Sequence, residues 1–174
     1  MFVRHPTKTY TSTGAVILVP NQALALMWEG LSNYRKARVE GCCFWYGPNT
    51  DSKEMSVTHV VFPKQINNRR SFKVASDAIA EMSAATRPLR IINRAQIHTH
   101  PRRWTGHSLY DDDHAISRKA ISIVLPYYGK PSDSWPEGFG FHVFQNEAWH
   151  LLTSRQASER VRLVEGEVKL IDLR

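Results

Sequence analysis

Short apolar runs recur along the chain at the lengths that strands require. Four of them are rich in β-branched or aromatic residues and predict buried strands, at residues 14–19, 39–47, 89–97 and 121–125. Residues 55–62 alternate between apolar and polar and predict a half-buried strand. Two further runs around an Asn-Glu turn predict a hairpin, and a final run predicts a last strand, at residues 139–145, 148–152 and 168–173.

Between these runs the apolar positions follow a helical period. From Asn21 to about Arg35 they recur on one helical face, as Leu24, Met27, Trp28, Leu31 and Tyr34. A second helix is expected to be capped by Ser76 or Asp77 and to end before Pro88, with its inward residues at Ala75, Ile79 and Met82. Residues 112–119 and 154–164 allow shorter helices. This order predicts a single α/β domain over residues 1–174, with helices packed on a mixed, curved sheet.

Composition bears on where in the cell this domain is expected. The chain has 174 residues, of which 42% are hydrophobic, and no window approaches the roughly 18 uninterrupted apolar residues of a membrane span. The first residues lack the apolar core of a signal peptide, so a cytoplasmic location is expected. Residues 1–11 are polar and turn-rich and predict a loosely held start, to which Phe2-Val3 could add an edge strand.

The two cysteines, Cys42 and Cys43, are adjacent within a predicted buried strand. Neighbours on a strand point to opposite faces, so a disulfide between them is not expected. We interpret both as reduced packing residues, with metal binding as the alternative.

Charge is the next feature of the sequence that bears on partners. The formal net charge of +7 is spread along the chain, and a basic balance favours acidic partners, either nucleic acid or an acidic patch on a protein. Residues 64–73 form a basic stretch that we interpret as a solvated connection, with substrate docking as the alternative. Residues 127–138 are rich in Pro, Gly and Ser and carry two tyrosines and a tryptophan, which predicts a loop with aromatic contact potential.

Candidate chemistry gathers in the stretch from Ile97 to Ala115, IHTHPRRWTGHSLYDDDHA. Pro101 cannot continue a central strand, so His98 and His100 should lie at the carboxyl end of the preceding strand. Residues i and i+2 of a strand share a face, so the two imidazoles can converge on one metal ion. Asp111, at the start of the following short helix, can add a carboxylate. Two histidines, one carboxylate and a position left for water are the components of a catalytic zinc site.

The spacing His98-x-His100-Pro101, six residues, then Ser108-x-x-Asp111 resembles the signature of the JAMM metalloproteases, also called the MPN-plus or JAB-domain family. The resemblance covers nearly the full length and implies a single JAB/MPN-like domain with a cytidine-deaminase-like core. It implies one catalytic Zn²⁺ ion bound by His98, His100 and Asp111, with Ser108 helping to stabilise the tetrahedral intermediate. It also implies a glutamate, well upstream, that acts as general acid and base.

Glu40 is the candidate for that glutamate. It stands near the entrance of the strand at 39–47, where a carboxylate either lies at the surface or projects into a site, and the residues alone leave both open. The resemblance favours a catalytic role, because the glutamate of that family precedes a Gly-containing hydrophobic strand after the first long helix, as Glu40-Gly41 does. The competitors are Glu29, on the polar side of the first helix, and Glu54, in a turn.

The resemblance is greatest to stand-alone bacterial JAB proteins, some of which are encoded beside ubiquitin-like conjugation enzymes in antiviral defence systems. It implies a zinc-dependent peptidase or isopeptidase that cleaves or processes ubiquitin-like conjugates, with conjugating enzymes as further partners and no membrane partner. Substrate recognition is then expected from loops at 47–54, 63–73 and 127–138.

Alternatives are a peptidase that processes a sulfur-carrier protein, and a non-catalytic zinc-binding or nucleic-acid-binding module of the same fold. Nucleic acid is disfavoured because the Gly and Pro pattern of DNA-repair-associated relatives is absent. His107 and His114, which do not match the signature, are assigned to the surface or to positions behind the ligands.

Overall fold

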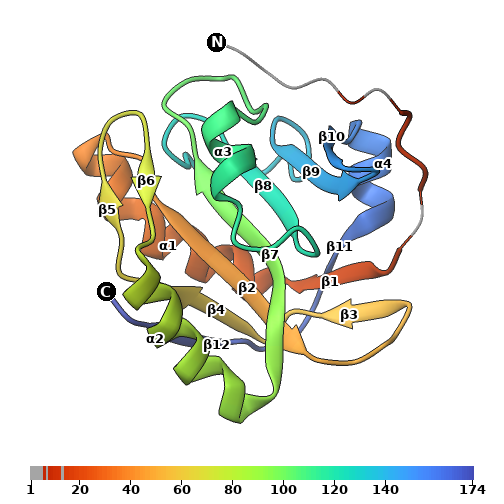
Figure 1. Cartoon of the computed structure of the whole chain (residues 1–174), viewed down its shortest axis with the longest axis horizontal. Coiled ribbons are helices and arrows are strands. Elements are labelled where there is room, and N and C mark those ends of the chain that lie inside the picture. The colour runs from red at the N-terminus through yellow and green to blue at the C-terminus, as the bar shows by residue number, and fades with distance from the viewer. Residues whose placement is uncertain (1–5, 7, 13) are drawn as a thin grey trace.

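A seven-stranded mixed sheet forms the centre of the protein (Figure 1). The structure, a computed structural model, describes residue 6, residues 8–12 and residues 14–174, so the strand predicted at Phe2-Val3 lies outside the described residues. In spatial order the strands are β10 (Ala148–Leu151), β9 (Gly140–Gln145), β8 (Ile121–Leu125), β7 (Ile91–Thr99), β2 (Cys42–Pro48), β4 (His59–Phe62) and β12 (Lys169–Asp172). Because β7 runs parallel to β8 and antiparallel to β2, the predicted mixed sheet is confirmed.

Helices and a second sheet cover the two faces of the central sheet. A parallel three-stranded sheet and the long helix α1 (Asn21–Ala37) lie on one face of the central sheet. The strands of the smaller sheet are β11 (Val161–Val164), β1 (Val16–Pro20) and β3 (Glu54–Ser56). The remaining elements are the hairpin strands β5 (Ile66–Asn67) and β6 (Phe72–Lys73), the helices α2 (Ser76–Thr86), α3 (Leu109–His114) and α4 (Ser154–Arg160), and the 3-10 turn η1 (Arg87–Leu89). Within the described ranges, no helix has the length and apolar composition that would let it cross a bilayer.

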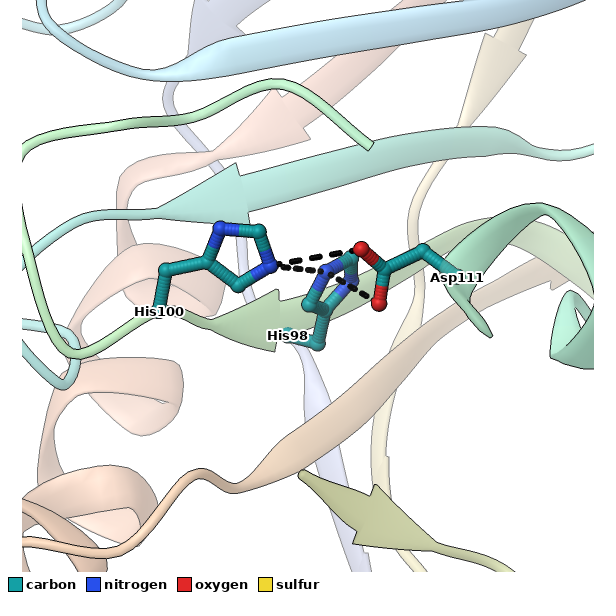
Figure 2. A group of neighbouring side chains, drawn as sticks. All are labelled: His98, His100 and Asp111. Carbon is teal, nitrogen blue, oxygen red and sulfur yellow. Dashed lines mark hydrogen bonds and ion pairs between the residues drawn. The ribbon is translucent and has the colours of Figure 1, made fainter. Parts of the chain in front are cut away.

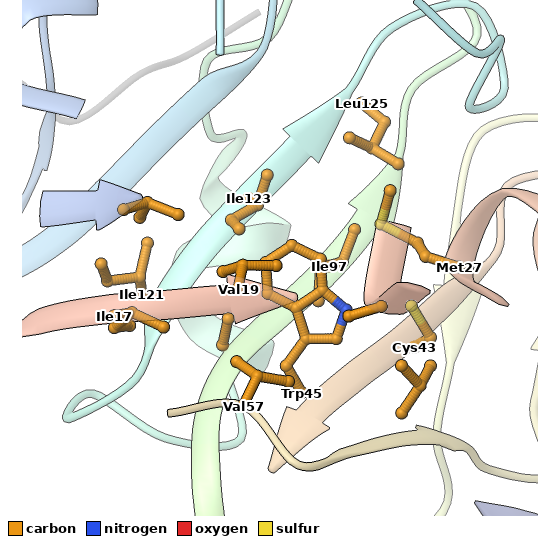
Figure 3. Close-up of a cluster of buried hydrophobic side chains, with 14 of the residues drawn as sticks. Ile17, Val19, Met27, Cys43, Trp45, Val57, Ile97, Ile121, Ile123 and Leu125 are labelled. Atoms are coloured by element: carbon orange, nitrogen blue, oxygen red, sulfur yellow. The ribbon is translucent and has the colours of Figure 1, made fainter. Parts of the chain in front are cut away.

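The two faces of β2 pack into two separate apolar clusters. Cys43 and Trp45 lie in the larger cluster, which includes Ile97 and the buried side of α1 (Figure 3). Cys42 and Phe44, which alternate with them, lie in a smaller cluster that includes residues of α2. Both cysteines are free and buried, and burial raises the pKa of both thiols, so the interpretation of them as reduced packing residues is confirmed.

Residues 55–62 do not form the single strand that their alternation predicts. They divide into β3, which pairs with β1, and β4, which pairs with β2. Between the two strands the Val57 N–H donates to the carbonyl oxygen of Leu18 and the Thr58 N–H to that of Tyr46, so the chain passes from one sheet to the other at this point. The alternation of apolar and polar residues shows only which side chains are buried. It does not change where the chain exchanges one partner strand for another, so the sequence pattern could not reveal the break.

The start of α2 also differs from the prediction. Its N-cap is Ala75, without a side-chain cap hydrogen bond, so neither Ser76 nor Asp77 caps the helix. Its buried residues are Ala78, Met82 and Thr86. Ala75, which was predicted to face inward, precedes the first turn. The helix ends before Pro88, as predicted. The basic stretch 64–73 is not a plain connection, since it contains the β5–β6 hairpin.

Two of the shorter helices are displaced from their predicted positions. The helix expected at 112–119 is α3, which begins at Leu109 and ends at His114, because Ser108 forms a capping box with the third helical residue. The helix expected at 154–164 ends at Arg160. Residues Val161–Val164 form β11 instead, where their apolar side chains pair beside β1. The predicted hairpin of β9 and β10 and the last strand β12 are present.

Candidate metal centre

Three predicted ligands meet at the carboxyl end of β7. His98 lies in the strand and His100 directly after it, and their Nε2 atoms are 3.2 Å apart. Asp111 reaches them from the first turn of α3, with Oδ1 3.4 Å from Nε2 of His98 and Oδ2 3.4 Å from Nε2 of His100 (Figure 2). All three side chains are largely buried. The convergence that the i, i+2 spacing predicts is therefore present.

The spacing of these donor atoms suits a small divalent ion. Around a tetrahedral zinc ion, donors at about 2.0–2.1 Å are separated from one another by roughly 3.3–3.4 Å. The distances between the two imidazole nitrogens and from each nitrogen to the carboxylate are close to that separation, and one donor atom from each residue lies within 4.8 Å of the others. His98, His100 and Asp111 could therefore hold a metal ion.

Local hydrogen bonds orient the ligands toward one another. Nδ1 of His100 lies 3.0 Å from the carbonyl oxygen of Trp104. A carbonyl only accepts, so this nitrogen donates, which leaves Nε2 available as a metal donor. The Trp104 ring also stacks on His100, with centroids 5.2 Å apart and 14° between planes. On the other side, Oδ2 of Asp111 accepts from the Ser108 N–H at 2.7 Å and from its hydroxyl at 2.8 Å. Ser108 thus fixes the carboxylate.

Burial and mutual attraction set the protonation of the three ligands. Burial is the main cause that lowers the pKa of His98 to about 3, so this imidazole is neutral at physiological pH. Burial alone would raise the pKa of Asp111, but His98, His100 and the Ser108 N–H hold it well below its ordinary value. Burial alone would lower the pKa of His100, but the hydrogen bond and charge of Asp111 raise it. His98 thus offers a neutral imidazole and Asp111 a carboxylate, the forms in which these side chains bind a metal ion.

Glu40 lies beside the three ligands because β2 pairs with β7. The Thr99 N–H donates to the carbonyl oxygen of Gly41, and the Gly41 N–H donates to the Thr99 hydroxyl, which places the start of β2 at the ligand end of β7. The backbone of Glu40 is held by the β5–β6 hairpin, through its N–H to the Asn68 carbonyl oxygen at 2.8 Å and its carbonyl oxygen to the Asn67 amide at 2.6 Å.

Glu40 lines the same cavity as His100 and Asp111. The cavity has a volume of about 510 Å³, and its wall includes Glu40, His100, Ser108 and Asp111. Glu40 is only 4% exposed, and burial, with His100 opposing and Asp111 adding to it, raises its pKa to about 7. A carboxyl with this pKa can take up or release a proton near neutral pH. The competitors lie elsewhere on the surface: Glu29 is exposed on α1, and Glu54 pairs with Arg162.

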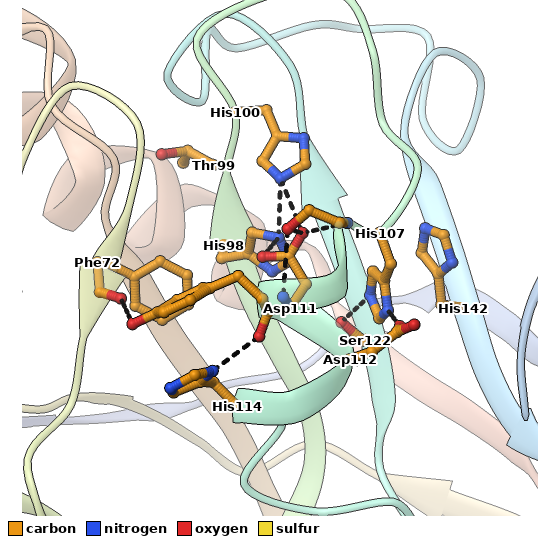
Figure 4. Close-up of polar contacts among 12 residues, drawn as sticks. Phe72, His98, Thr99, His100, His107, Asp111, Asp112, His114, Ser122 and His142 are labelled. Carbon is orange, nitrogen blue, oxygen red and sulfur yellow. Dashed lines mark hydrogen bonds and ion pairs between the residues drawn. The ribbon is translucent and has the colours of Figure 1, made fainter. Parts of the chain in front are cut away.

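A buried polar row behind the ligands was not found from the sequence. His142, Ser122 and Gln96 are cross-strand partners on β9, β8 and β7, so they share one face of the sheet with His98. His107 packs on this row, with its ring stacked 3.8 Å from that of His142 (Figure 4). Of the two positions left open for it, at the surface or behind the ligands, His107 takes the second, since it is buried, whereas His114 is exposed.

His107 connects α3 to the central sheet. Its Nδ1 lies 3.0 Å from Oδ1 of Asp112 and its Nε2 2.8 Å from Oγ of Ser122. Asp, His and Ser follow one another here in the order of a hydrolase triad, but the Ser122 side chain is 0% exposed and no substrate can reach it. The contacts instead join the residue before Ser108 and the residue after Asp111 to β8. His142 secures the intervening loop, since its Nε2 donates to the Thr105 carbonyl oxygen at 2.9 Å.

We predict that Ser122→Ala weakens metal binding without removing a ligand. The substitution leaves Nε2 of His107 buried without its partner, which costs about 1–3 kcal/mol in the free energy of unfolding. Loss of a contact that orients a ligand typically lowers metal affinity by about 10- to 100-fold. Urea denaturation and competitive zinc titration measure the two effects, and the d–d absorption of the cobalt-substituted protein reports changed ligand geometry. Ser154→Ala, at an exposed position of α4, is the matched control. An unchanged cobalt spectrum and affinity would limit this contact to packing.

Comparisons with known proteins support the fold. No family model matches the sequence, and no curated protein matches it. Two solution structures are among the solved structures that are similar. The solution structure of a protein from Desulfitobacterium hafniense has a TM-score of 0.62 and 16% identity, covering 87% of this chain and 95% of that one. The solution structure of a protein from Salinibacter ruber has a TM-score of 0.51 and 16% identity, covering 78% of this chain and 88% of that one. At this identity the likeness shows the mixed α/β fold alone.

Proposed function

We propose that this protein is a zinc-dependent peptidase or isopeptidase of the JAMM type, acting on ubiquitin-like proteins or their conjugates. The observation that carries the proposal is that His98, His100 and Asp111 bring their donor atoms together, and that His100 and Asp111 line one cavity with Glu40. The JAMM-like spacing selects the two histidines and the aspartate, and the resemblance to that family adds Glu40. Two imidazole nitrogens and a carboxylate oxygen are also a donor set that zinc favours in catalytic sites.

The proposed reaction divides the chemistry among few groups. A Zn²⁺ ion held by His98, His100 and Asp111 would supply a Lewis acid for the activation of water and the polarisation of the scissile carbonyl. Glu40, with its pKa raised to about 7, accepts the proton of the attacking water and returns it to the leaving amine. The Ser108 N–H holds Asp111, and the Ser108 hydroxyl, which donates to Asp111 in this structure, lines the cavity and can turn to donate to the oxygen of the carbonyl under attack.

The experiment that tests the proposal uses chelated and zinc-reloaded protein. We expect the reloaded protein to cleave a ubiquitin-like protein fused to, or joined by an isopeptide bond to, a reporter, and we expect chelation to abolish cleavage. A fusion of a sulfur-carrier protein ending in Gly-Gly serves as a second substrate. A higher kcat/KM for this fusion than for the ubiquitin-like substrate would favour the alternative function, the processing of a sulfur-carrier protein. A protein that holds stoichiometric zinc and cleaves none of these amides would contradict the proposal.

A further inference from the structure

Three loops meet around His100 at the mouth of the cavity. The loop after β8 lies against the ligand loop, because the Tyr128 N–H donates to the His100 carbonyl oxygen at 2.7 Å and the Tyr127 N–H to that of Arg102 at 3.3 Å. The same loop touches the β5–β6 hairpin, because the Tyr128 hydroxyl donates to the carbonyl oxygen of Arg69 at 3.3 Å. The three loops, residues 64–73, 101–107 and 127–130, thus lie side by side.

Besides Lys64 and Lys73 at the ends of the first segment, these loops carry five exposed cations and no acidic residue. The cations, which we call the cationic rim, are Arg69, Arg70, Arg102, Arg103 and Lys130. Arg70 and Arg102 line the same cavity as Glu40 and Asp111, the two acidic residues in its described wall. Arg103 and Lys130 line a second pocket, which also includes Glu137. Across the described part of the chain, none of the five forms an ion pair. Their charge is therefore available to a ligand.

Clustered cations at a concave site attract anions and raise their local concentration. We propose that the cationic rim binds an acidic peptide segment next to the scissile bond, so that the site takes substrates whose sequence there is rich in Asp and Glu. The proposal rests on the proposed peptidase function. A peptide is the expected occupant because Arg70 and Arg102 line the same cavity as Glu40 and His100, where a charged segment of the cleaved chain itself would reach them.

The test compares labelled peptides that differ only in the four residues on one side of the scissile amide: all Glu, all Gln or all Lys. Binding is measured by fluorescence anisotropy on zinc-loaded Glu40→Gln protein, and cleavage on the unaltered protein. We expect the Glu peptide to bind about 3- to 10-fold more tightly than the Gln peptide at low salt, the range that two exposed ion pairs supply. The preference should decline as ionic strength rises and should appear in KM more than in kcat.

Charge reversal locates the effect. Arg70→Glu together with Arg102→Glu should remove the preference for Glu and favour the Lys peptide, while the control Arg87→Glu, at an exposed arginine outside the cavity, should leave it intact. Equal binding of all three peptides would overturn the proposal even if every one is cleaved. Displacement of the Glu peptide by lower concentrations of single-stranded RNA or DNA than of unlabelled peptide would also overturn it. A Glu preference without any cleavage would support the rim as a binding surface and contradict the peptidase function.

Discussion

His98→Ala should abolish tight zinc binding. The variant loses one of three donors that lie within 4.8 Å of one another, and because loss of an orienting contact alone costs about 10- to 100-fold in affinity, loss of a donor should cost more than about 100-fold. Zinc that binds only the folded chain raises its stability by about 4 kcal/mol at a thousand times Kd. For a chain of this length that corresponds to a rise in Tm of roughly 8–16 °C.

The measurement is the change in Tm on adding zinc, taken for each variant relative to its own metal-free Tm, so that any loss of packing at His98 cancels. We expect a large shift for the unaltered chain and almost none for His98→Ala or Asp111→Asn. His114→Ala is the matched control, since His114 is an exposed histidine in the same stretch that is outside the ligand cluster. An equal shift for His98→Ala and the unaltered chain would place the ion elsewhere.

The ligands could be predicted from the sequence because their geometry is local. His98 and His100 share a face through strand periodicity, and Asp111 follows Ser108 at the interval of a helical cap, so short-range spacing alone brings them together. Glu40 could be assigned only through a family resemblance. Its proximity to the ligands comes from the antiparallel pairing of β2 with β7, which joins residues almost 60 positions apart.

The parts that the sequence did not reveal depend on register between distant strands. The sequence left His107 either at the surface or behind the ligands, and its burial follows from the alignment of Ser122 on β8 with His142 on β9. The division of residues 55–62 between two sheets likewise follows from the partners of β3 and β4. Pairing is fixed by the sum of contacts across a sheet, and no single segment carries that information.

Glu40→Gln should retain zinc binding and lose peptidase activity. The amide has nearly the shape of the carboxyl but cannot take up the proton of water, and general acid–base catalysis typically contributes about 10²- to 10⁴-fold, so kcat should fall by that factor. Zinc stoichiometry and the zinc-dependent Tm shift should be unchanged, because Glu40 is not among the clustered donors. Glu29→Gln and Glu54→Gln, at the two exposed competitors, should retain full activity.

The same variant should also change the pH dependence of the stability of the metal-free protein, which can be measured without any catalysis. Burial raises the pKa of Glu40 from its ordinary value of 4.5 to about 7 in the folded chain. The unfolded chain therefore releases this proton at lower pH, and the stability of the unaltered protein falls as pH rises from about 4.5 to about 7 and stays lower above that range. Glu40→Gln lacks this titration, so its stability relative to the unaltered protein should increase across the same pH window in urea denaturation. A pH-independent difference between the two proteins, together with retained cleavage, would mean that Glu40 is solvated and that another group handles the proton.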